Sequence, residues 1–272
     1  MRCSMSKKIV RINSIITAVI LFLYAGLGLL NVLLRLLSGI AKITLPTGVM
    51  LCLAVLLPTV VLLIFGIMQT KKKQGKADLI FSIPTLIVSI IWIIFAVLNW
   101  IIALFGNVIT EIYYKMDIGV PLGDLISFIS YLNIAYMMLT TVIALYLLAV
   151  FIIRVLCAKQ RWLQIKAELH KPAAALLILV PNLLSLIQTL LHPIFNRMGM
   201  DILVMFAEIY SIASFVITTA LTLALAVFVL VFGLIIKKQP AAKVQEPEPA
   251  SEQKQSADLP FNVPAGVSTD DL

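Results

Sequence analysis

Residues 172–192 read "PAAALLILVPNLLSLIQTLLH", an apolar run with a proline and an asparagine side by side near its middle. A helix of about 20 predominantly apolar residues crosses a hydrocarbon core of ~30 Å. This run has that length, and five more runs of the same kind fall near 12–34, 47–70, 79–105, 125–153 and 202–236. The sequence therefore predicts an all-α polytopic membrane protein with about six transmembrane helices.

The composition points to the same class of protein. Of 272 residues, 61% are hydrophobic and only 12% are charged, whereas a soluble domain has about 45–50% apolar and about 25% charged residues. A single water-soluble core cannot bury that much apolar surface, so part of the solvent must be lipid. We expect the lipid bilayer as a partner and a multi-pass location, in the cell (plasma) membrane.

The distribution of positive charge predicts the orientation. Seventeen of the 21 Lys and Arg residues lie in the N-terminus, the second and fourth loops and the C-terminal segment, which alternate with the apolar runs. The positive-inside rule then places both termini in the cytoplasm. The net charge of +8 is thus explained by topology, and no nucleic-acid partner is expected. Basic cytoplasmic loops are instead suited to anionic lipid headgroups.

The C-terminal segment differs in character from the rest of the chain. Residues 237–272 are rich in Pro, Glu, Gln and Ser, a composition that buries too little apolar area to offset chain entropy. We expect a transmembrane domain over 1–236 followed by a disordered cytoplasmic tail. The tail is either a docking segment for a cytoplasmic protein partner or merely a solvating extension.

The fourth loop carries an amphipathic pattern. Trp162, Ile165 and Leu169 recur at helical spacing, with Arg161 and Lys166 on the remaining faces. Such a segment is typical of a helix in the headgroup region, so Arg161, Trp162 and Lys166 are candidate lipid-headgroup contacts. The alternative is that the fourth span simply extends into the cytoplasm.

The sequence contains no recognisable arrangement of catalytic residues. The sequence contains no zinc-protease motif, nucleophile elbow or Gly-rich phosphate loop. The two histidines, His170 and His192, face opposite sides of the membrane in the predicted topology. We therefore expect no enzyme activity, no metal site and no cofactor.

Polar residues follow one helix face in each of the last three predicted spans, in the outer half of the membrane. In the fifth span they recur at intervals of three and four residues, within about 80° on a helix that turns 100° per residue. The candidate solute-path residues are Asn133 and Thr140 in the fourth span, Asn182, Ser185, Thr189 and His192 in the fifth, and Glu208 and Thr218 in the sixth. Glu208 is expected at the outer interface, since about 43 Å of helix separates it from Lys237; a buried, proton-coupled Glu208 is the alternative.

Two functional interpretations follow from these polar faces. In the first, the protein is a small transporter or permease for a neutral or polar solute, with an outward-facing polar vestibule and a hinge at Pro181. In the second, it is a non-transporting scaffold, partner subunit or regulator, and its polar faces are helix-packing contacts. Ser, Thr and Asn side chains commonly make such contacts between membrane helices.

Overall fold

The computed structural model describes residues 7–38, 46–70, 75–116 and 122–235. All of them belong to the first of two units, Met1–Ile236. The predicted disordered tail, 237–272, lies outside the described residues, and its disorder stays a prediction.

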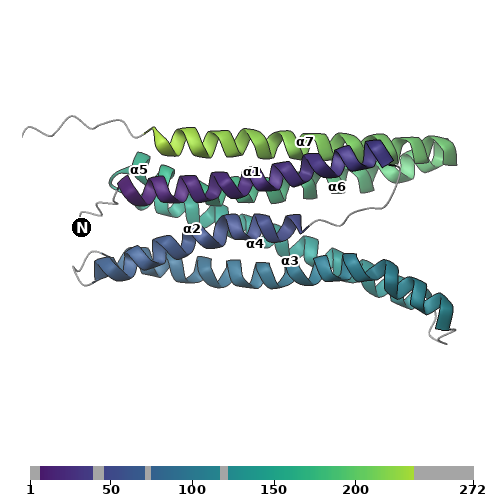
Figure 1. The fold of residues 1–272 in the computed structure, drawn as a ribbon, viewed down its shortest axis with the longest axis horizontal. Helices are drawn as coiled ribbons and strands as arrows, with labels where there is room; N and C mark the ends of the chain where they lie inside the picture. The colour runs from purple at the N-terminus through teal and green to yellow at the C-terminus, as the bar shows by residue number, and fades with distance from the viewer. Residues whose placement is uncertain (1–6, 39–45, 71–74, 117–121, 236–272) are drawn as a thin grey trace, which may run out of the picture. The chain divides into compact units, whose positions relative to one another are not determined.

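The described residues form seven helices and no strand (Figure 1). The bounds are α1 Lys7–Ser38, α2 Thr47–Thr70, α3 Lys76–Met116, α4 Leu122–Cys157, α5 Arg161–Ala167, α6 His170–Met198 and α7 Met200–Leu234. All but the short α5 are long and apolar enough to cross a membrane, so the prediction of an all-α protein with six membrane-spanning helices is confirmed. Most of the helices extend a few residues beyond the apolar runs.

Each membrane-spanning segment is helical along its length. Lipid offers no hydrogen-bond partner for backbone N–H and C=O groups, and a helix pairs these groups internally. The connection between α6 and α7 is a single residue, Gly199, with φ +124°. That backbone conformation is accessible to glycine without steric cost. It allows α7 to reverse direction immediately after Met198.

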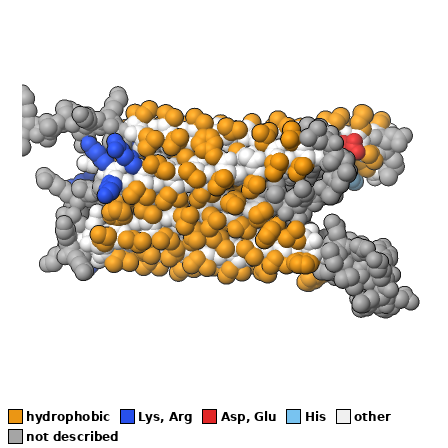
Figure 2. Space-filling model, viewed as in Figure 1, with side chains coloured by type: hydrophobic (Ala, Val, Ile, Leu, Met, Phe, Trp, Pro, Cys, Tyr) orange, Lys and Arg blue, Asp and Glu red, His pale blue; other side chains and the backbone are white. Residues whose placement is uncertain are grey.

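The six long helices form a closed ring. Each one packs against the next in the order α1, α2, α3, α4, α6 and α7, and α7 packs against α1 again. Helix α5 packs against α1, α4 and α7. We call the end of the ring that holds α5 the basic end, since Lys and Arg side chains gather there in Figure 2, and the other end the cavity end. Between them the visible outer surface is hydrophobic (Figure 2).

Helices α1 and α7 approach most closely near the basic end. A Cβ atom added at Gly233 would collide with the Oγ atom of Ser14, whereas one added at Gly28 would lie 3.1 Å from the Oγ1 atom of Thr219. Small residues let membrane helices approach in this way. The α1–α7 contact is therefore tight at the basic end and looser toward the cavity end.

Candidate functional site

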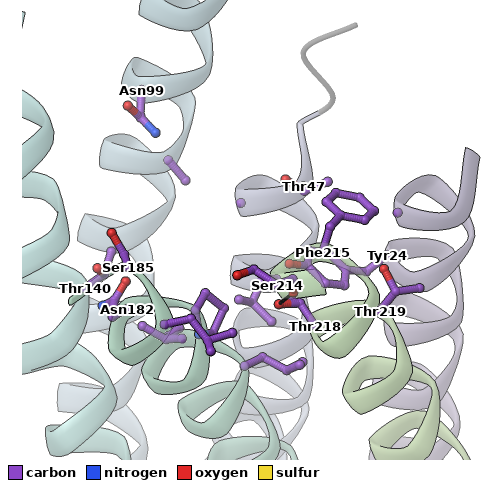
Figure 3. A pocket seen from close by; sticks show the side chains of 18 of the residues that line it. Tyr24, Thr47, Asn99, Thr140, Asn182, Ser185, Ser214, Phe215, Thr218 and Thr219 are labelled. Carbon is purple, nitrogen blue, oxygen red and sulfur yellow. Dashed lines mark hydrogen bonds between the residues drawn. The ribbon is translucent and has the colours of Figure 1, made fainter. Parts of the chain in front are cut away.

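A cavity of about 670 Å³ lies inside the ring and is lined by residues of all six long helices. Figure 3 shows labelled lining residues from each of them, including Tyr24 on α1, Thr47 on α2, Asn99 on α3 and Thr218 on α7. A volume of this size is within the range of small-molecule pockets. The six helices therefore leave a cavity between them at this end of the ring.

The cavity occupies one end of the membrane-spanning part. Helix α2 has 24 residues, about 36 Å at 1.5 Å per residue, which is little more than one crossing of a ~30 Å core. Its first residue, Thr47, lines the cavity, and so does Leu51 one turn further in. The cavity therefore reaches the first residue of α2, at one end of this membrane-spanning helix.

The lining combines amides, hydroxyls and aromatic rings, and none of the described residues that line it is charged. The amide and aliphatic hydroxyl side chains are those of Asn31, Thr47, Asn99, Thr140, Asn182, Ser185, Gln188, Ser211, Ser214, Thr218 and Thr219. The aromatic side chains are those of Tyr24, Trp92, Trp100, Tyr136, Tyr210 and Phe215. Such a lining can hydrogen-bond an uncharged solute and contact its flat faces, but it offers no opposite charge to an ion.

The structure brings half of the predicted path residues into the cavity. Thr140, Asn182, Ser185 and Thr218 line it, and so does the candidate hinge Pro181. The other four, Asn133, Thr189, His192 and Glu208, are exposed and lie outside the cavity lining.

Along α6, which is the fifth predicted span, two predicted residues lie outside the cavity for different reasons. Thr189 donates its hydroxyl back to the Ser185 carbonyl at 2.9 Å, and Gln188 contributes to the lining instead. His192 lies a further turn along, beyond the lining.

Hydrogen bonds from Asn182 to α4 and from Tyr210 on α7 tie α6 to its neighbours beside the cavity. Asn182 donates from Nδ2 to Thr141 Oγ1 at 2.7 Å, and the Tyr210 hydroxyl donates to the Leu184 carbonyl at 2.6 Å. Asn182 therefore has two roles, as a lining residue and as a packing contact with α4. Pro181 has no N–H group, so the carbonyl of Leu177 lacks its usual helical donor; both residues line the cavity.

The lining residues of the first three spans were not predicted. The predicted polar faces belong to the last three spans only, but the cavity is also lined by Tyr24, Asn31, Thr47, Trp92 and Asn99. A signal was present on α3, where Asp78, Ser82, Thr85, Ser89 and Trp92 recur at intervals of four and three residues. All five are buried.

A second polar feature lies at the basic end. Arg154 on α4 contacts Asp78 on α3 at 2.8 Å and also contacts Glu168, which lies between α5 and α6. Lys171 on α6 contacts the second oxygen of Glu168 at 3.0 Å, and Gln164 on α5 donates to Glu168. We call Asp78, Arg154, Glu168 and Lys171 the ion cluster; each of its residues is less than a tenth exposed.

The ion cluster differs from the predicted arrangement. Arg154 and Lys171 were counted among the cytoplasmic loop charges, but they belong to the ends of α4 and α6 and are buried. Each is buried together with a carboxylate partner, which offsets the cost of removing a charge from water. The cluster contains two acidic and two basic side chains, so it is balanced in charge.

The candidate headgroup residues lie on and around α5. Arg161 and Trp162 are exposed, Trp162 by 72%. Lys166 is half-buried: its ammonium group donates to the carbonyl of Ile235 and lies 5.2 Å from the centre of the Phe232 ring. The first two are therefore exposed side chains, while the ammonium group of Lys166 is bound to the end of α7.

The chain matches no protein-family model, no curated protein and no solved structure. Among the described residues, no group of three or more His, Cys, Asp or Glu side chains is placed to hold a metal ion. A functional assignment therefore depends on the cavity and the ion cluster themselves.

Proposed function

We propose that this membrane protein binds an uncharged, hydrogen-bonding solute in the cavity and moves it across the bilayer. The observation that carries the proposal is the uncharged lining of amides, hydroxyls and aromatic rings contributed by all six spans. Binding pockets typically combine apolar walls with a few convergent polar groups. A charged solute would have to give up its hydration without an opposite charge to replace it, which is costly.

The proposed direction follows from the distribution of charge. With the basic end in the cytoplasm, as the positive-inside rule indicates, the cavity faces outward. The protein is then a cell-membrane permease in its outward-facing state. Pro181 is the proposed hinge, because the missing hydrogen bond weakens α6 beside the cavity.

A non-transporting scaffold or partner subunit is the second candidate. It is favoured by the bond from Asn182 to Thr141 and by that from Tyr210 to Leu184, which hold helices together. Packing alone, however, gives no reason for a cavity of about 670 Å³ lined by polar groups. Secondary proposals are anionic-lipid binding at Arg161 and Trp162, and a cytoplasmic protein partner for residues 237–272.

Cysteine accessibility separates the two candidates. In a chain from which Cys3, Cys52 and Cys157 have been removed, single cysteines replace Ser185 and Gln188, which line the cavity. The matched controls are Leu186 and Leu190, on the exposed face of the same helix. A membrane-impermeant maleimide is added to membrane vesicles from the cavity side.

We expect the maleimide to label positions 185 and 188 but not positions 186 and 190, which would face lipid. Protection of all four positions in a folded protein would remove the transport proposal and leave the packing interpretation. Faster labelling when the maleimide is added from outside than from the cytoplasmic side would also support the proposed outward-facing orientation of the cavity.

A further inference from the structure

Buried polar groups continue from the inner part of the cavity toward the basic end. On α1, Tyr24 lines the cavity, and Thr17 and Asn13 lie seven and eleven residues earlier on nearly the same helix face. On α3, Trp92 lines the cavity, and Thr85 lies seven residues earlier. Asn13, Thr17, Thr85 and Trp92 are each at most 1% exposed.

Several of these groups have no hydrogen-bond partner among the described residues. They are the Oδ1 atom of Asn13, the Oγ1 atom of Thr17 and the Nε1 atom of Trp92. Other buried threonines donate back to their own helix, as Thr59 and Thr85 do to the carbonyl four residues earlier at 2.8 Å, but Thr17 does not. Leaving a buried polar atom unpaired destabilises a fold, so an all-structural core would favour apolar side chains at these positions.

The unpaired hydroxyl of the neighbouring Ser14 is explained by helix packing alone. Its hydroxyl also has no partner among the described residues, but it occupies the space left by the missing side chain of Gly233 on α7. It lies 100° around the helix from Asn13. The requirement for close α1–α7 packing explains Ser14, and it does not explain Asn13 or Thr17.

The ion cluster lies at the end of these polar faces. Asp78 is on the α3 face seven residues before Thr85, and Asn13 donates to the carbonyl of Ala167, next to Glu168, at 3.2 Å. On α6, Lys171 is six residues before the cavity-lining Leu177, about 9 Å along the helix axis. Along α6, fewer than two helical turns therefore separate the cluster residue Lys171 from the cavity lining.

We propose that the solute path continues from the cavity along the buried polar faces of α1 and α3, and that the ion cluster is its closed end. This inference rests on the proposed transport function. Arg154 on α4 joins α3 and the α5–α6 connection through Asp78 and Glu168, so separating these pairs removes the ionic contacts among the three elements. Asn13 and Thr17 would then find their missing partners in water or solute.

The alternative is that the ion cluster is a permanent structural link. Two charge-balanced double variants distinguish the two roles, since neither leaves a single buried charge. Asp78→Asn with Arg154→Gln keeps the Glu168–Lys171 pair, and Glu168→Gln with Lys171→Gln keeps the Asp78–Arg154 pair. The matched control is Arg161→Gln, which removes an exposed charge at the same end.

The readout is a cysteine at position 17 in the cysteine-free chain, reacted with a membrane-impermeant maleimide added from the basic-end side. The exposed native Cys157 at the end of α4, kept alone in a separate chain, confirms that the reagent reaches this side. We expect slow labelling of Thr17→Cys in the parent and in the Arg161→Gln control. Labelling should be roughly tenfold faster or more in a double variant, because weakening the closed state raises the population of the open one.

Unchanged labelling of position 17 in folded double variants, judged by monodisperse size-exclusion profiles, would overturn the inference. Loss of the folded state in both would do so too, because a gate must open without unfolding the protein. Labelling of Ser185→Cys from the cavity side distinguishes failure of this inference from failure of the transport proposal. If position 185 reacts and position 17 never does, only this inference fails; if position 185 is protected, the transport proposal fails first.

Discussion

The two ends of the helix ring use polar residues in opposite ways. At the cavity end, uncharged amides, hydroxyls and aromatic rings line a cavity. At the basic end, four charged side chains are buried in direct contact with one another. Uncharged polar groups that line a cavity can hydrogen-bond to water or solute there, whereas charges in a low-dielectric interior need charged partners. The cavity end is thus lined by uncharged polar groups, while the basic end is held together by ion pairs.

The largest expected effect comes from breaking the ion cluster on one side only. Arg154→Met leaves Asp78 and Glu168 without their shared partner, and we expect a loss of about 3–5 kcal/mol in the free energy of unfolding, as for other broken buried pairs. Denaturant titration in detergent would measure it. The cavity-end control, Thr218→Val, should lose no more than about 2 kcal/mol. Equal losses would mean that the ion cluster stabilises the fold no more than a single uncharged residue of the cavity lining does.

An intermediate effect is expected from the contact between α1 and α7. Gly233→Ala places a methyl group on the Oγ atom of Ser14 and should cost about 1–3 kcal/mol, as overpacking does elsewhere. Gly28→Ala meets Thr219 at 3.1 Å, a contact that a small side-chain shift relieves, so its cost should be lower. Thermal unfolding of both variants tests the order, and a more destabilising Gly28→Ala would reverse the comparison.

The smallest effect is spectroscopic and leaves the fold intact. Of the three tryptophans, Trp92 and Trp100 line the cavity and Trp162 lies on α5. In a Trp162→Phe chain, emission therefore reports on the cavity alone. We expect uncharged acrylamide to quench it more than iodide does, because the lining offers no positive charge to an anion. In the chain that keeps only Trp162, at the basic end, quenching by iodide should be much closer to quenching by acrylamide. An equal ratio of iodide to acrylamide quenching in the two chains would contradict the uncharged character of the cavity lining.

The sequence was sufficient to predict the membrane-spanning helices, since apolar length alone determines them. It was less informative about which polar residues meet. Asn182 and Ser185 share a face, and both line the cavity, but helix periodicity alone does not say that the lining ends before His192. The helical spacing of buried polar residues on α3 marks an inward face, but which residues of the first three spans line the cavity depends on how all six helices pack.

The ion cluster was missed for a different reason. A charged residue between apolar runs is read as a solvent-facing loop residue, and Arg154 and Lys171 fit that reading until Asp78 is brought beside them. Asp78 is 76 residues from Arg154 in the chain. Only the spacing of Glu168 and Lys171, three residues apart, gave a local indication of a pair.

The end of α7 also has a mechanical consequence. Lys166 binds the carbonyl of Ile235, and Trp162 packs edge-on against Phe232 with ring centres 6.4 Å apart. These contacts attach α5 to the end of α7, where the described residues end at Ile235. A force applied to the chain beyond Ile235 would therefore be transmitted to α5, which carries Gln164 and so touches Glu168.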